Sequence, residues 1–301
     1  MNTPVGWLSL ADSHNRGNQL IEYATANILG ERGPLIAVSS FTLPSEADML
    51  DLHRCSCVIL PGATQLDVAE HPIAPVIRQL RLPVIAPGVA LCRKEGTPDL
   101  AIARAIKNEI GARDPYTYRT LVNAGIPARL VGCSTLFLGR SAHWQQREGP
   151  IVISLGRGPQ KLLQECIRSC AGLAPVILLE HVPDLQPVFP LPDNVTRILW
   201  QDPLQAMALY SSASVVLTGR IHGCLPCIAL GTPVLFFGEW YDSRYSLLEY
   251  LGIDVLFPDP VKISAAVKKI LEGHMPPADC FSRAEELRSS MTAFINAAVW
   301  K

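Results

Sequence analysis

Residues 215–238 read VVLTGRIHGCLPCIALGTPVLFFG, and this stretch decides the fold. An apolar run over 215–217 is followed by a short polar segment, by a helix-forming stretch of small residues that ends at Gly231, and by a second apolar run. This order predicts strand, loop, helix and strand, the repeating unit of a parallel sheet. Arg220 and His222 fall in the loop. Loops at the carboxyl ends of parallel strands face the ligand crevice, so both side chains are candidates for an anion site.

Local chemistry leaves two interpretations of this pair open. Arg220 offers a planar fork for a carboxylate or phosphate, and His222 can move a proton near neutral pH. Alternatively, the arginine caps or pairs locally and the histidine is satisfied in the core. Only the rest of the chain can decide between them.

Composition indicates two globular domains and a small ligand. The chain has 301 residues, of which 49% are hydrophobic and 18% charged. With 27 acidic residues against 26 Lys and Arg, no overall field would attract nucleic acid. No apolar stretch reaches membrane-spanning length, and the N-terminal segment does not resemble a signal peptide. We therefore expect a cytoplasmic protein without a nucleic-acid partner or a membrane span.

The nine cysteines are expected to be reduced core residues. Cys224 and Cys227 form a CxxC, but no second pair stands at the spacing that a zinc site needs. We expect neither a metal site nor a redox role.

Short apolar strands alternate with helices along the whole chain, which is typical of parallel sheets covered by helices on both faces. In the first half, strands are expected at 5–10, 35–39, 58–60, 84–86, 111–113 and 129–131, with helices near 19–29, 45–53, 73–80, 99–109 and 116–124. A polar segment at 139–149 interrupts the pattern before a second series begins. We divide the chain into domains at 1–143 and 144–301, with the final helix packing back on the first.

Several loops carry further candidate residues. The loop after the first strand holds Asp12, Ser13, His14, Asn15 and Asn18. At least one of Asp12, Ser13, Asn15 and Asn18 should bond a free amide at the start of the following helix, and the others are free for a ligand. Arg113 ends a strand before Asp114 and Pro115, so it is either a second cation at the crevice or part of a surface ion pair. Arg157 lies in a tight Gly-Arg-Gly turn directed towards the crevice, although Pro159 breaks the dinucleotide fingerprint.

With these residues in view, the chain resembles the polysaccharide pyruvyl transferase family. The similarity is best at 219–234 and is supported by 112–126, 130–138, 242–253 and the Asn15-x-Gly17-Asn18 loop. It implies two Rossmann-like domains facing a cleft, the arrangement called GT-B. It also implies transfer of the enolpyruvyl carbon of phosphoenolpyruvate to a sugar, usually as a ketal, with release of phosphate and without a cofactor.

The resemblance assigns roles to the candidate residues. His222 would be catalytic, and the donor would be bound by Arg113, Arg157, Gly219 and Arg220. The acceptor, a saccharide-like molecule, would lie against Asp12, His14, Asn15 and Asn18. The family usually has an aspartate where this chain has Asn18, and its glycine-rich loop is reduced here to 61–63.

Alternatives to this activity remain. They are a glycosyltransferase of the same fold with a nucleotide-sugar donor, a degenerate binding protein that has kept the fold, and, least supported, a nicotinamide oxidoreductase. Self-association as a homo-oligomer is left open.

Overall fold

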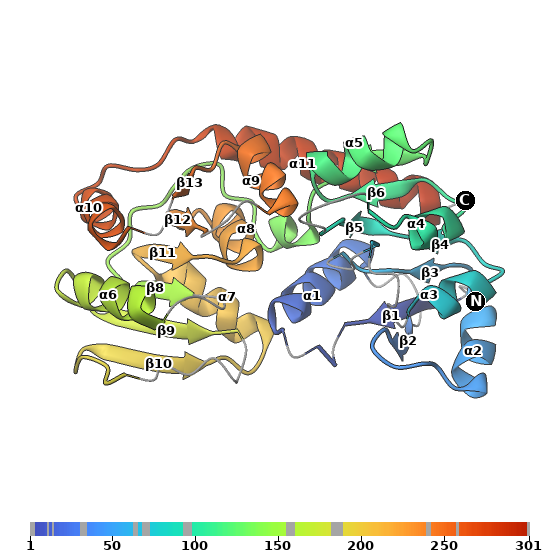
Figure 1. Cartoon of the computed structure of the whole chain (residues 1–301), viewed down its shortest axis with the longest axis horizontal. Coiled ribbons are helices and arrows are strands. Elements are labelled where there is room, and N and C mark those ends of the chain that lie inside the picture. Colours follow the sequence, from blue (N-terminus) through green and yellow to red (C-terminus); the bar gives the residue numbers. More distant parts are fainter. Residues whose placement is uncertain are drawn as a thin grey trace.

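Parallel β-sheets organise both halves of the chain, two in the first half and one in the second (Figure 1). The computed structural model describes residues 4–10, 12–13, 15–30, 35–62, 66–67, 73–92, 98–154, 160–181, 189–238, 242–256 and 259–299. Every strand pair in these ranges is parallel. The predicted α/β class with two Rossmann-like halves is confirmed.

The first half alternates strands and helices. Its elements are β1 (Val5–Ser9), α1 (Gly17–Leu29), β2 (Leu35–Ser39), α2 (Glu46–His53), β3 (Val58–Ile59), α3 (Ile73–Gln79), β4 (Val84–Ile85), β5 (Pro87–Val89), α4 (Ala101–Ala105), β6 (Ile110–Ala112), α5 (Pro115–Asn123), β7 (Ala128–Leu130) and the 3₁₀ helix η1 (Ser134–Phe137). The strand orders are β2-β1-β3-β4 and β5-β6-β7. Gly111 N of β6 donates to Ala86 O, between β4 and β5, at 2.9 Å, so the sheet β5-β6-β7 continues the sheet β2-β1-β3-β4.

The second half forms one six-stranded sheet. Its elements are β8 (Ile151–Ser154), α6 (Gln160–Ala171), β9 (Val176–Glu180), β10 (Val195–Leu199), α7 (Pro203–Ser212), β11 (Val215–Thr218), α8 (Ile221–Leu230), β12 (Val234–Phe237), η2 (Ser243–Tyr245), α9 (Ser246–Leu251), β13 (Val255–Leu256), α10 (Pro260–Leu271) and α11 (Asp279–Val299). The order β10-β9-β8-β11-β12-β13 reverses between β8 and β11. Such a reversal is where open α/β sheets bind ligands.

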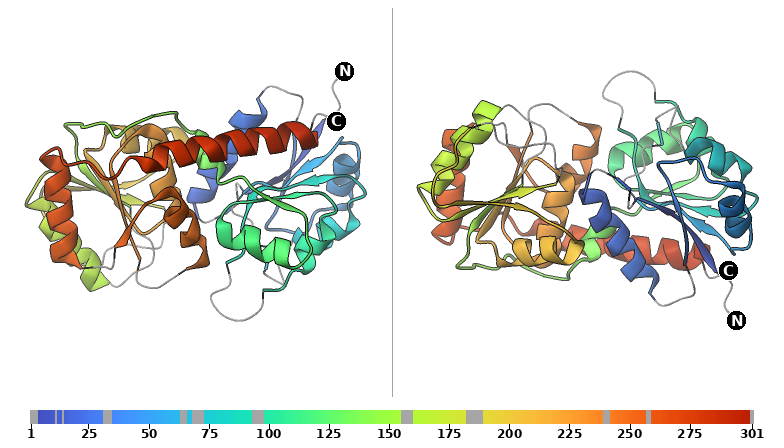
Figure 2. Two further views of the ribbon diagram at one scale, coloured as in Figure 1. Left: turned by 90° about the horizontal axis from the view of Figure 1, so that it is seen from above. Right: turned by 90° about the horizontal axis from the view of Figure 1, so that it is seen from below.

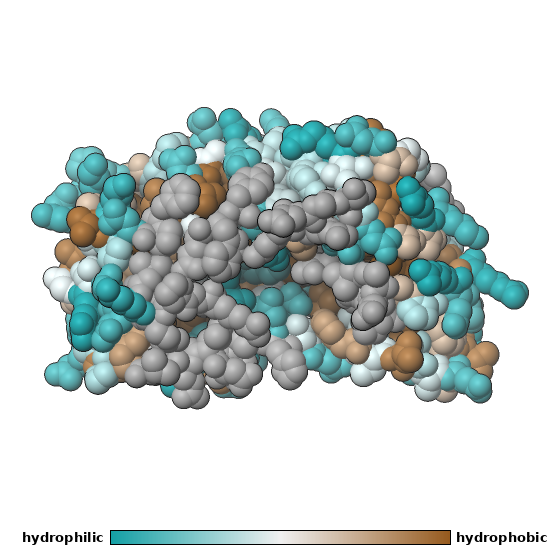
Figure 3. Space-filling view, viewed as in Figure 1, coloured by the Kyte–Doolittle hydropathy of each residue, from teal (hydrophilic) through white to brown (hydrophobic). Residues whose placement is uncertain are grey.

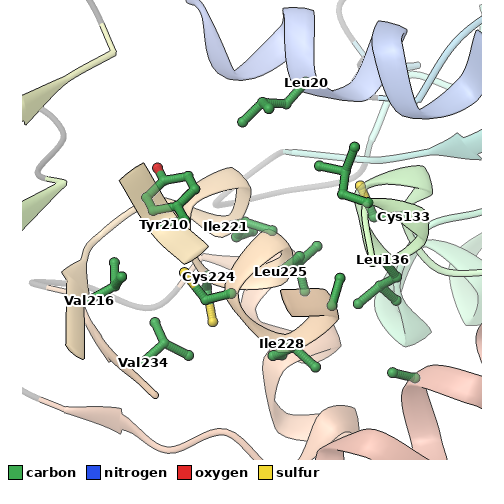
Figure 4. Close-up of a cluster of buried hydrophobic side chains, with 14 of the residues drawn as sticks. Leu20, Cys133, Leu136, Tyr210, Val216, Ile221, Cys224, Leu225, Ile228 and Val234 are labelled. Carbon is green, nitrogen blue, oxygen red and sulfur yellow. The ribbon is translucent and has the colours of Figure 1, made fainter. Parts of the chain in front are cut away.

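An apolar cluster joins the two halves through α8. Leu225 and Ile228 of α8 lie in one buried cluster with Val216 of β11, Leu20 of α1 and Leu136 of η1 (Figure 4). Burial of each Leu, Ile or Val side chain in this cluster stabilises the fold by roughly 1.5–3 kcal/mol. The boundary between the halves is therefore packed like a core.

Helix α11 also connects both halves, crossing from one to the other (Figure 2). Its first part adds Phe281 to the cluster around α8. Its last turns place Phe294 in a second cluster with Trp7 of β1 and Ile59 of β3. The chain end thus completes the core of the first half.

The main difference from the sequence prediction is the helix expected at 99–109. Only α4 is helical there, because Ile106 adopts an extended backbone. Glu109 instead pairs with Arg129 of β7 at 3.0 Å, just before β6 begins. The nine cysteines are all unbonded, and Cys224 and Cys227 are buried on α8, as expected. Within the described ranges, no helix combines the length and the apolar character needed to cross a membrane.

Phe294→Ala is expected to lower the free energy of unfolding by about 3–5 kcal/mol, because it removes buried surface and leaves a cavity between the end of α11 and the first sheet. Urea unfolding followed by circular dichroism measures the change. Phe41→Ala is the matched control, since Phe41 is 38% exposed, and a loss of about 0.5 kcal/mol or less is expected there. Equal losses in the two variants would contradict this role of α11.

Candidate functional site

The loops after β1, β9 and β11 meet between the two sheets. Arg220 Nη1 donates to Asn15 Oδ1 at 3.1 Å, and Arg16 N donates to His181 O at 3.0 Å. Both hydrogen bonds join residues from opposite halves of the chain. In the space-filling view, hydrophilic residues are visible in a hollow between the halves (Figure 3).

The turn from β11 into α8 is shaped by Thr218 and Gly223. Thr218 Oγ1 accepts a hydrogen bond from Arg220 N at 3.0 Å and donates to Ser154 O at 2.7 Å. A Cβ atom on Gly223 would lie 2.4 Å from Thr218 Oγ1, so only glycine fits after His222. This close approach fixes the backbone of the turn, and with it the positions from which the Arg220 and His222 side chains extend.

His222 lies on the first turn of α8, against the start of α1. A Cβ atom on Gly17 would come within 3.1 Å of His222 Cβ and 3.2 Å of its Nδ1. The His222 Nε2 atom is enclosed and has no hydrogen-bond partner in the part of the chain that the structure describes. Burial, and then the charges of Arg113 and Arg244, lower its pKa well below 6.5, so the free imidazole is neutral.

Arg113 is the cation that the first half contributes. It follows β6 and is only 2% exposed, so the alternative of a surface ion pair is wrong. Its Nε lies 3.7 Å from Asp114 Oδ2, and neither Nε nor Nη2 has a hydrogen-bond partner among the described residues. Asp114 caps α5 instead, accepting from Thr117 N at 2.8 Å, as predicted. Arg113 therefore has hydrogen-bonding capacity left for a ligand.

Arg244 is a further cation of the site, and the sequence analysis did not single it out. Its Nε donates to Asp242 Oδ1 at 2.8 Å and its Nη2 donates to Oδ2, so the buried carboxylate holds the guanidinium. Ser243 Oγ donates to Leu91 O at 3.2 Å, which attaches this segment to the first half. The available signal was that residues 242–253 belong to the family resemblance and follow β12.

The loop after β1 is held together by its own side chains. Asn15 Oδ1 accepts from Gly17 N at 3.2 Å, so Asn15 bonds the first amide of α1 as well as Arg220. The N-cap position itself is held by Arg16, without a side-chain cap. Asn18 Nδ2 donates to Ser13 Oγ at 2.8 Å, which occupies this amide within the loop. Asp12 is exposed in the turn.

Gly219, His14 and Arg157 are the remaining predicted site residues. Gly219 lies beside the carbonyl of Phe237, where a Cβ atom would be 3.1 Å from the oxygen. His14 and Arg157 lie outside the described residues, so their predicted roles stay predictions.

The assembled groups favour an anionic ligand. The positive charges of Arg113, Arg220 and Arg244 each help to lower the pKa of His222, so three cations act on one neutral imidazole. Across the described ranges, no three His, Cys, Asp or Glu side chains gather in a way that could hold a metal ion. Guanidinium groups beside an imidazole can bind carboxylate or phosphate and move a proton.

Comparison with solved structures identifies the fold class. MnaA of S. aureus, in a co-structure with UDP, is 11% identical, covers 98% of this chain and 95% of its own, and gives a TM-score of 0.63. UDP-GlcNAc 2-epimerase from Neisseria meningitidis, bound to UDP-GlcNAc, is 11% identical, covers 99% of both chains and gives a TM-score of 0.60. The protein thus has the GT-B fold of such enzymes.

The profile of one family, polysaccharide pyruvyl transferase, matches residues 15–241. The chain belongs to this family, which is one of transferases. A comparison with curated proteins gives no match.

Acidification is expected to destabilise the fold through His181, a buried residue at the end of β9. Burial, and then the charge of Arg220, lower the pKa of His181 well below 6.5. Below about pH 6.5 the unfolded chain binds a proton that the folded chain does not, so stability falls by up to about 1.4 kcal/mol per pH unit as the pH decreases. Urea unfolding at pH 7 and pH 5 measures this slope.

His181→Gln removes one of two buried histidines with a lowered pKa and should reduce the slope, with the rest coming from His222, whereas His53→Gln, at an exposed position, should leave the slope as in the wild type. A slope that is the same in all three proteins would show that His181 does not titrate as described.

Proposed function

We propose that the protein transfers the pyruvyl group of phosphoenolpyruvate to hydroxyls of a saccharide-like acceptor, forming a ketal and releasing phosphate. The observation that carries the proposal is that Arg113, with two guanidinium nitrogens that lack a hydrogen-bond partner in the described structure, and Arg220 both act on His222, whose Nε2 is enclosed. Family membership supports the same reaction class.

Phosphoenolpyruvate suits this distribution of charge. It presents a carboxylate and a phosphate on the same carbon atom, and a guanidinium can bind either group through two parallel hydrogen bonds. Arg113 and Arg220 would hold the donor from opposite halves of the chain, and Arg244 would add positive charge while Asp242 fixes its position. Arg157 and Gly219 are proposed as further donor contacts.

His222 is proposed to move the protons. It is neutral in the free site, and a trianionic donor would raise its pKa by the attraction of opposite charges. It could therefore take a proton from an acceptor hydroxyl and pass one to the donor.

The proposed chemistry balances without a cofactor. The methylene carbon takes up a proton and becomes a methyl group as the first acceptor hydroxyl adds to the central carbon. A second hydroxyl then displaces phosphate from that carbon and closes the ketal. Of the two hydroxyl protons, one is matched by the new C–H bond and the other leaves with phosphate.

The acceptor is proposed to lie against Asp12, His14, Asn15 and Asn18. Because Asn18 is an amide and is bonded to Ser13, it cannot act as a base, which leaves proton removal to His222. We also propose that the chain divides at 143/144 into an acceptor domain and a donor domain, and that the protein is cytoplasmic.

Arg113→Gln is expected to weaken phosphoenolpyruvate binding about 10- to 100-fold, because a hydrogen bond to a charged group contributes about 1.5–3 kcal/mol. Isothermal titration calorimetry measures the affinity. The control is Arg129→Gln, a half-exposed arginine paired with Glu109, which should bind as the wild type does. Stabilisation of the wild type by a nucleotide sugar but not by phosphoenolpyruvate would instead support a glycosyltransferase.

His222→Ala is expected to reduce the rate of phosphate release by about 10²- to 10⁴-fold in the presence of an acceptor. Binding of phosphoenolpyruvate should persist, since both arginines remain. A phosphate-release assay across a saccharide panel measures the rate, with His53→Ala as the control. Wild-type turnover by the His222 variant would remove this residue from the mechanism.

A further inference from the structure

Two neighbouring surface pockets lie beside α11, where this helix crosses between the halves (Figure 2). Helix α11 packs on η1, and η1 packs on α1, so the three elements meet there. The smaller pocket measures about 300 Å³ and the larger about 390 Å³, and both have the size of a small-molecule site. Arg140, Thr292 and Asn296 line both pockets, which together form one surface, the α11 groove.

The α11 groove lies away from the catalytic residues. Asn27, near the end of α1, lines the smaller pocket, whereas His222 lies against Gly17 at the beginning of that helix. The helix rises by about 15 Å between Gly17 and Asn27. None of the three arginines that act on His222 lines either pocket. A ligand in the groove would therefore leave the donor site open.

One wall of the groove is a polar stripe on α11. Ser289, Thr292 and Asn296 are spaced by three and four residues, so their exposed side chains lie on one face of the helix. Asn27 lines the smaller pocket together with Thr292 and Asn296. These side chains form no hydrogen bond within the described ranges, and their hydroxyl and amide groups can both donate and accept. The hydroxyls of a saccharide have the same double capacity.

Apolar side chains complete the smaller pocket. Ile28 of α1, Phe137 of η1 and Ile295 of α11 all line it, and Ile295 is buried. A sugar ring presents C–H groups on its faces and hydroxyls around its edge. A pocket that combines apolar and polar walls therefore suits a sugar ring better than a compact inorganic ion.

Two arginines give the groove positive charge. Arg288 lines the larger pocket and is only 4% exposed. Its Nη1 donates to Leu136 O at 3.0 Å and its Nε donates to Glu285 Oε2 at 2.7 Å, so Glu285 compensates its charge. Arg140 is exposed and forms no ion pair in the part of the chain that the structure describes. Its guanidinium is available for a carboxylate, which it can bind through two parallel hydrogen bonds.

We propose that the α11 groove is a second saccharide site and that it binds a sugar bearing a carboxylate. The carboxylate would pair with Arg140, which both pockets share, and the sugar hydroxyls would bond Asn27, Thr292 and Asn296. The proposed reaction makes such a sugar, because each pyruvyl ketal carries a free carboxylate. Identifying the ligand as the ketal product rests on the proposed function, whereas a site for acidic sugars does not.

A site for its own product would keep a modified saccharide chain attached to the protein. While one unit of the chain occupies the groove, the unmodified units of the same chain have a raised effective concentration at the catalytic cleft. The groove would thereby favour successive modification of one chain over modification of many chains in turn.

The test is titration of the full-length protein, followed by NMR of the ligand, with the pyruvate ketal of methyl galactoside and with unmodified methyl galactoside. Excess phosphoenolpyruvate in each sample keeps the ketal out of the donor site. The ketal should bind about fivefold or more tightly than methyl galactoside, because only the ketal can pair with Arg140.

Two variants should remove this preference. Arg140→Gln deletes the cation, and Asn296→Asp adds a negative charge with almost no change of shape. Each should weaken binding of the ketal about fivefold or more and leave the affinity for phosphoenolpyruvate unchanged. Arg119→Gln, at an exposed position of α5, is the matched control and should bind both ligands as the wild type does. Both groove positions are exposed, so the melting temperature should not change.

Equal affinity for the ketal and for methyl galactoside would overturn the proposal, as would equal affinity for the ketal in the wild type, Arg140→Gln and Asn296→Asp. Loss of ketal binding in Arg113→Gln but not in Arg140→Gln would place the ketal in the catalytic cleft and would also overturn it. If the ketal binds and Arg140→Gln loses it, but phosphoenolpyruvate does not bind, the proposed function is contradicted and the groove is not.

Discussion

The packing of α8 between the two halves is the constraint on which the rest of the structure depends. One face of this helix lies on its own sheet, and other side chains lie against α1 and η1 (Figure 4). A helix enclosed in this way has a fixed start, and that start carries Arg220 and His222. Apolar burial, which is not directional, thereby positions two polar groups whose chemistry is directional.

Several arginines and two histidines lie close together, so their positive charges would repel one another. Nearby carboxylates compensate some of these charges more than others. Asp242 compensates Arg244 through two hydrogen bonds, whereas Asp114 lies farther from Arg113 and caps a helix. The histidines respond by staying neutral, because burial and nearby cations disfavour the imidazolium form. The free protein therefore keeps unmet positive potential that an anionic ligand would relieve.

The sequence predicted the parts of this arrangement that depend on local pattern. The alternation over 215–238 and the cap at Asp114 could both be predicted, because each follows from neighbouring residues. Arg244 and His181 were missed, since only tertiary contacts bring them near His222. The helix expected at 99–109 ends early for a similar reason: Ile106 is extended and residues 110–112 pair with β5 and β7, and such tertiary pairing overrides helix propensity.

The return of α11 to the first sheet has a consequence for how the protein is made. Phe294 of α11 shares a core with Val5 and Trp7 of β1, which precede it by almost all of the described residues. During synthesis the first sheet leaves the ribosome well before α11, so one face of that sheet stays uncovered until α11 has emerged. The half that is made first is thus the last to acquire its complete core, and exposed apolar surface of this kind is prone to aggregation in the meantime.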